Sequence, residues 1–160
     1  MAESAPFFHG QEMAASLAKT KNISTTLITD SAVFAMMSRV NKVIIGTNSV
    51  MADGGLRAAS GVMTAALAAK HYSVPLYVCA AIFKLTPLYV DQGLNDFVSP
   101  QESLRGLDGK ILSKVDSPTP RFEYVPPDLV TLFVSNISGY APSYVYRLLG
   151  EYYHKHDYEL

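Results

Sequence analysis

The stretch from Val43 to Leu56 reads VIIGTNSVMADGGL and decides the fold. Residues 43–47 form a near-continuous apolar run, which is typical of a parallel strand covered on both faces. A glycine-containing loop follows, then an alanine-rich helix predicted over 56–72, then a second buried strand predicted over 76–81. Strand, loop, helix and strand in this order make a βαβ unit, with the loop where open α/β sheets place their ligands. The sequence therefore predicts an α/β fold with a largely parallel sheet.

Weaker patterns extend this unit in both directions. Helical periodicity and capping residues predict helices at residues 10–19, 30–39 and from Pro142 onward. Residues rich in β-branched and aromatic side chains predict strands at 25–29, 111–115 and 122–125, and residues 132–134 are apolar. The pattern between 86 and 110 predicts a loop or a weak helix.

The composition indicates one domain with few charges. Its 160 residues are the length of a single domain, and 49% of them are hydrophobic while 17% are charged. Soluble domains are usually ~25% charged, so this low value suggests that partners cover part of the surface. The net charge of −1 lacks the basic excess of a nucleic-acid-binding protein, and no apolar run reaches the roughly 18 residues of a membrane span. The single cysteine, Cys79, favours a reducing compartment, so we expect a cytoplasmic protein.

The residues Asp53, Gly54 and Gly55 precede the helix predicted at 56–72. Backbone amides at the start of a helix can hold an anion such as a phosphate. The motif is neither a dinucleotide-binding fingerprint nor a Walker A loop, which argues against dinucleotide or nucleoside triphosphate binding. The alternative is a tight turn that needs flexible backbone. Both interpretations remain open from the residues alone.

The other chemically reactive residues are isolated in the sequence. Cys79 lies inside an apolar strand with no base beside it, which predicts a buried structural thiol rather than a nucleophile. Arg57 and Lys84 lie near the predicted carboxyl ends of strands, where they would either bind a phosphate or remain solvated charges. The histidines show no metal-ligand spacing except in the tail, so we predict no metal site: His9, His71, His154 and His156.

Tyrosines are concentrated near the C-terminus, more densely than a small core requires. Tyrosine combines apolar area with a hydroxyl group and is enriched at interfaces. We therefore expect some of these side chains to pack in the core and others to contact a partner: Tyr140, Tyr144, Tyr146, Tyr152 and Tyr153.

Six segments resemble the regulatory subunits of eukaryotic translation initiation factor 2B, and the β type in particular. The resemblance extends over essentially the whole chain and rests on residues 29–40, 42–47, 53–58, 68–71, 124–133 and 141–148. The α, β and δ subunits of that factor share a Rossmann-like domain with isomerases acting on methylthioribose 1-phosphate and ribose 1,5-bisphosphate. The resemblance implies that residues 1–160 are a single C-terminal Rossmann-like domain, an open and mostly parallel sheet flanked by helices. It also implies an N-terminally truncated fragment without the family's helical domain and first strands, which we expect to associate with itself or with partner strands.

The resemblance implies a site that has lost its catalytic groups. Where the isomerases carry a catalytic aspartate, this chain has Asn48, and an amide does not serve as a carboxylate acid or base. Their substrate-holding Asn-Lys pair, at the start of the following helix, corresponds to Ala58 and Ala59, and their catalytic cysteine lies upstream of this chain. We therefore expect no catalytic residue and no cofactor. A relict ligand pocket would be formed by Asn48, Asp53, Gly54 and Gly55.

The function implied by the resemblance is that of a non-catalytic regulatory subunit in the guanine-nucleotide exchange factor complex for translation initiation factor 2. Its partners would be the δ and α types of subunit, the catalytic subunits, and initiation factor 2 with its own α subunit. No membrane or direct nucleic-acid contact is expected. The alternatives are a sugar-phosphate isomerase and a sensor of a phosphorylated metabolite. The predicted subunit contacts are Asn136, Tyr140, Tyr144, Tyr146, Arg147 and Tyr152.

Overall fold

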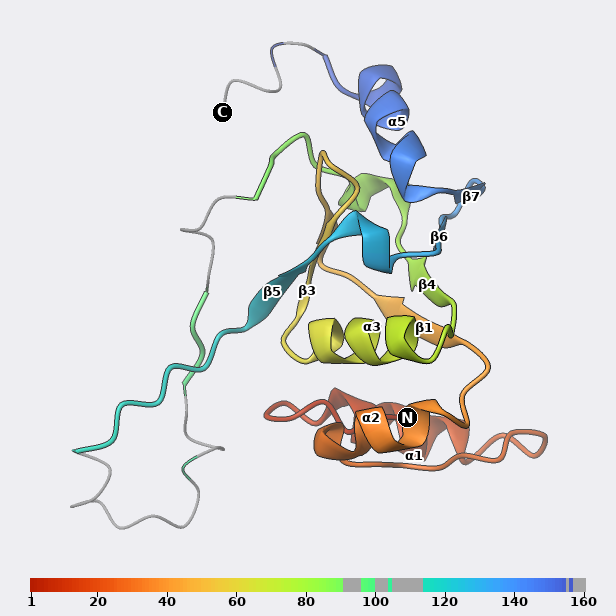
Figure 1. The fold of residues 1–160 in the computed structure, drawn as a ribbon, viewed down its shortest axis with the longest axis vertical. Helices are drawn as coiled ribbons and strands as arrows, with labels where there is room; N and C mark the ends of the chain where they lie inside the picture. The colour runs from red at the N-terminus through yellow and green to blue at the C-terminus, as the bar shows by residue number, and fades with distance from the viewer. Residues whose placement is uncertain (91–95, 100–103, 105–113, 155, 157–160) are drawn as a thin grey trace.

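The computed structural model describes residues 1–90, 96–99, 104, 114–154 and 156 (Figure 1). Most of the strand predicted at 111–115 lies outside these residues. Figure 1 shows α1 (His9–Leu17) and α2 (Val33–Met37) together at one end of the molecule and α5 (Val145–Tyr152) at the other. Two β-sheets and α3 (Val62–His71) lie between these ends.

The main sheet has four strands in the order β1 (Val43–Gly46), β4 (Leu76–Cys79), β6 (Leu132–Val134) and β7 (Gly139–Tyr140). β1, β4 and β6 are mutually parallel, and β7 returns antiparallel to β6. The predicted βαβ unit is confirmed, because β1 leads through α3 into its parallel neighbour β4. With helices packed on it, this sheet has the predicted open, mostly parallel architecture.

The second sheet corrects the prediction that a helix begins at Leu56. Leu56–Ala59 form the strand β3, which pairs antiparallel with β2 (Ser49–Val50) on one side and β5 (Phe122–Val125) on the other. Leu56 and Ala58 are fully buried whereas Arg57 and Ala59 are not, which is the alternation of a strand. The helix α3 begins only at Val62, after Gly61. Alanine-rich composition favours a helix locally, but pairing with the distant β5 outweighs it.

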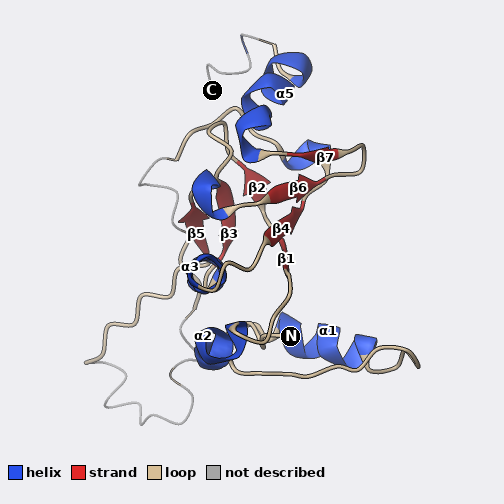
Figure 2. Ribbon diagram, turned by 45° about the vertical axis from the view of Figure 1, so that its right-hand side comes forward, coloured by secondary structure: helices blue, strands red, loops and turns tan. Residues whose placement is uncertain are grey.

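The strand predicted at 25–29 is present only as an extended segment. Ile28 forms an isolated parallel bridge with Ala2 and belongs to no named strand. Its N–H donates to the carbonyl of Met1 at 2.9 Å, and its carbonyl accepts from the N–H of Glu3 at 3.0 Å. This two-segment ribbon lies in the same part of the molecule as α1 and α2 (Figure 2).

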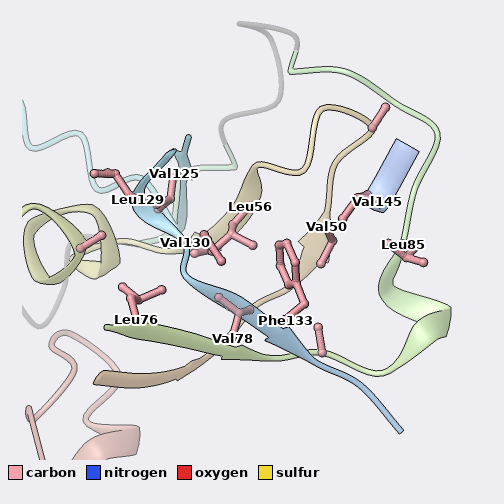
Figure 3. Packing of buried hydrophobic residues seen from close by; sticks show 14 of the residues in the cluster. Val50, Leu56, Leu76, Val78, Leu85, Val125, Leu129, Val130, Phe133 and Val145 are labelled. Carbon is pink, nitrogen blue, oxygen red and sulfur yellow. The ribbon is translucent and has the colours of Figure 1, made fainter. Parts of the chain in front are cut away.

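The hydrophobic core lies between the two sheets and is closed by α3 and α5 (Figure 3). Leu56 and Val125 from the antiparallel sheet and Leu76, Val78 and Phe133 from the main sheet are at most 4% exposed. Short 3-10 turns complete the chain at Asp30–Ala32, Ile82–Lys84, Pro127–Leu129 and Pro142–Tyr144. The last of these starts at Pro142, where the sequence predicted the final helix to begin.

Candidate functional site

The turn at Asp53, Gly54 and Gly55 is the tip of the β2–β3 hairpin and does not open a helix. The N–H of Gly54 donates to the carbonyl of Met51 at 2.9 Å, and the N–H of Met51 donates to the carbonyl of Gly55 at 2.8 Å. The Asp53 side chain caps its own turn, because its Oδ1 accepts from the N–H of Gly55 at 2.8 Å. The alternative of an anion site at a helix N-terminus is not supported here, since the next helix begins at Val62. The tight turn is the interpretation that the geometry supports.

Both glycines of the turn are required by close contacts. Gly54 has φ of +82°, and a Cβ atom at this position would lie 2.6 Å from the carbonyl oxygen of Pro142. A Cβ atom on Gly55 would overlap the ring of Tyr124 from β5. The hairpin tip is therefore pressed between β5 and the turn that leads into α5, with no space for a ligand against these two backbone positions.

Tyr124 fastens this hairpin tip to β5. Its hydroxyl donates to Oδ2 of Asp53 at 2.5 Å. Burial raises the pKa of Tyr124 well above its ordinary value, and the hydrogen bond and negative charge of Asp53 raise it further. Because the other carboxylate oxygen of Asp53 accepts from Gly55, both oxygens of this carboxylate are engaged by the chain itself.

We expect Tyr124→Phe to lower the free energy of unfolding by about 1 kcal/mol at pH 7, the value of one charge-assisted hydrogen bond that is partly exposed. The raised pKa means that the folded state favours the neutral phenol. This stabilisation is complete below the unfolded pKa of about 10 and is lost as the pH rises through the folded pKa. Urea denaturation at pH 7 and at alkaline pH measures both effects. The control is Tyr146→Phe, on a side chain that is 76% exposed. It should change neither the free energy of unfolding at pH 7 nor its loss at alkaline pH.

An equal loss of stability at alkaline pH in wild type and Tyr124→Phe would contradict this account. So would a Tyr124→Phe protein as stable at pH 7 as the wild type.

Asn48 lies at the opposite end of the hairpin from the Asp53 turn. It follows β1, is exposed, and its N–H donates to the carbonyl of Arg57 at 3.0 Å. The adjacent Thr47 is buried, and its hydroxyl is within hydrogen-bond distance of the carbonyls of Arg57 (2.9 Å) and Ser49 (3.0 Å). The four predicted pocket residues therefore lie at two separate ends of one hairpin.

The two cations considered as phosphate ligands are engaged by the protein. The Lys84 ammonium donates to the carbonyl of Thr47 at 2.6 Å and so ties the 3-10 turn after β4 to the end of β1. The Arg57 guanidinium forms an ion pair with Asp96 at 2.9 Å and lies 4.6 Å above the ring of Phe122. The Lys84 contact holds together the segments that follow the carboxyl ends of β1 and β4.

A cavity that sequence reasoning missed lies beside Ala59 on β3. Its volume is about 170 Å³, and its polar lining includes His9, Ser60 and Arg121. A second cavity of about 190 Å³ shares Ala59 and Ser60 and extends to Asp30. No local motif signals these cavities, because their walls come from segments far apart in the chain. Neither includes the predicted pocket residues.

Cys79 is exposed, so the prediction of a buried thiol was wrong. Its side chain belongs to the face of the main sheet that is turned away from the core. The described residues contain no cluster of three or more potential metal ligands. In the same part of the chain, no helix has the length and apolar character needed to cross a lipid bilayer.

The predicted subunit-contact residues divide into three groups. Asn136 accepts from the N–H of Ile82 at 3.0 Å, and Tyr140 stacks on Tyr144 with ring centroids 5.6 Å apart, so these residues support the fold. Tyr146 and Tyr152 are 76% and 50% exposed on α5. Arg147 is partly engaged, because its guanidinium lies 5.6 Å above the ring of Tyr144. Tyr153, the remaining tyrosine of this region, donates its hydroxyl to the carbonyl of Leu85 at 2.5 Å.

A family described as the initiation factor 2 subunit family matches residues 1–142. This chain belongs to the initiation factor 2 subunit family. It is 59% identical over 157 residues to translation initiation factor eIF2B subunit beta of Dictyostelium discoideum, covering 97% of this chain and 40% of that protein. The chain thus spans less than half the length of that relative of the family.

Solved structures support the same assignment of fold. The δ subunit of translation initiation factor eIF-2B from A. fulgidus has a TM-score of 0.81 and 26% identity, covering 93% of this chain and 46% of that one. 5-Methylthioribose 1-phosphate isomerase from Pyrococcus horikoshii OT3 has a TM-score of 0.79 at 20% identity, covering 94% of this chain and 43% of that one. At this low identity the isomerase shows only that this chain shares its fold.

Proposed function

We propose that this chain is part of a β-type regulatory subunit of the guanine-nucleotide exchange factor for translation initiation factor 2, and that it acts there without catalysing a reaction. The single observation that carries the proposal is the 59% identity to an eIF2B β subunit over 157 residues. A family assignment alone would leave the α, β and δ types open; identity at this level favours the β type.

The described site supports a non-catalytic role. By the resemblance, Asn48 takes the place of the isomerases' catalytic aspartate, and an amide is no general acid or base at neutral pH. By the same resemblance, the substrate-holding positions correspond to Ala58 and Ala59, which lie on the strand β3 and have no polar side-chain atoms. The nearby carboxylate of Asp53 is held by Tyr124 and Gly55. These residues therefore offer no unengaged carboxylate that would act as a general acid or base.

The proposed role is to pack against other subunits and transmit their state. In that role the partners are the δ and α types of subunit, the catalytic subunits and initiation factor 2 with its α subunit. Regulation would arise from different affinities for phosphorylated and unphosphorylated factor 2, because a ligand shifts the population of an assembly only through such a difference.

Affinity capture from a eukaryotic lysate tests this proposal, with the chain within its complete subunit as bait and mass spectrometry as readout. We expect the other exchange-factor subunits and initiation factor 2 in the captured material. In parallel, incubation with methylthioribose 1-phosphate should yield no isomerised product. A folded bait that captures none of these proteins, or that turns over the sugar phosphate, would overturn the proposal.

The exposed tyrosines of α5 are proposed subunit contacts, and Tyr146→Ala tests them. A central interface tyrosine contributes about 2 kcal/mol or more, so we expect at least a tenfold loss of affinity for the captured subunits. The matched control is Tyr72→Ala, a surface tyrosine at the end of α3, far from α5. Quantitative co-purification measures the difference. Equal recovery with Tyr146→Ala and wild type would remove α5 from the proposed interface.

A further inference from the structure

We draw no further inference here: the strongest candidate, the cavity beside Ala59 on β3 whose polar lining includes His9, Ser60 and Arg121, belongs to the candidate site already described, and nothing in the described part of the chain shows what fills it.

Discussion

Replacing Leu56 by alanine should lower the free energy of unfolding by about 3–4 kcal/mol, the largest effect that we expect from any single truncation in this chain. Leu56 is 0% exposed and pairs with Val50 and Val125 in the middle strand of the antiparallel sheet. Its side chain faces the cluster that includes Leu76 and Val78 of the main sheet (Figure 3). Removing most of this side chain leaves a cavity between the two sheets. The sheets can close only part of this cavity, because their other contacts hold them apart.

The measurement is urea denaturation followed by circular dichroism, with a thermal scan in which the midpoint should fall by about 10 °C. Leu67→Ala is the matched control, because Leu67 is half exposed on α3 and alanine favours a helix. We expect the control to change stability by under about 0.5–1 kcal/mol. If Leu56→Ala and Leu67→Ala lower the free energy of unfolding by the same amount, the region between the two sheets is not the core of the fold.

Leu56 also marks the point where sequence reasoning was least successful. The residues from 56 to 72 contain many alanines, and local propensity favours one long helix. In the structure the first four residues belong to β3, because Leu56 and Ala58 gain burial between the sheets and pair with β5, more than 60 residues later in the chain. Propensity is a weak prior that such long-range pairing overrides.

The parallel part of the fold was predictable because its signals are local. The apolar runs at 43–47 and 76–81 indicated two buried strands, and the helix between them made a parallel pair the expected topology. These strands, however, are buried on one face only, so the pattern that predicted double burial also led to the wrong prediction for Cys79. An apolar run indicates that a surface is to be covered; it does not indicate which molecule covers it.

The candidate site shows a similar division. Sequence reasoning identified Asp53, Gly54 and Gly55 as a turn with special backbone requirements, and the structure gives the turn. It had no signal for the partners that define its role, Tyr124 and Pro142, which lie on distant elements. Those contacts distinguish a latch between the hairpin and the start of α5 from an open ligand loop.

The contact of the hairpin tip with Pro142 leads to the second large expected effect. We expect Gly54→Ala to lower the free energy of unfolding by about 3 kcal/mol, the sum of a backbone and a packing contribution. Left-handed backbone costs a residue with a Cβ atom about 1–2 kcal/mol, and Gly54 has φ of +82°. The new methyl group would also lie 2.6 Å from the carbonyl oxygen of Pro142, and relieving such overpacking typically costs about 1–3 kcal/mol more.

Gly61→Ala separates these two contributions. Gly61 has φ of +98°, but a Cβ atom added there would meet no other atom within 4 Å, so alanine should cost only the backbone contribution of about 1–2 kcal/mol. Urea denaturation of both variants gives the difference directly. A larger cost for Gly54→Ala, by about 1 kcal/mol or more, supports a hairpin tip held against the turn before α5. Equal losses of stability in Gly54→Ala and Gly61→Ala would mean that the hairpin tip moves away from Pro142 at no cost. The latch formed by Asp53, Tyr124 and Pro142 would then not be a rigid part of this fold.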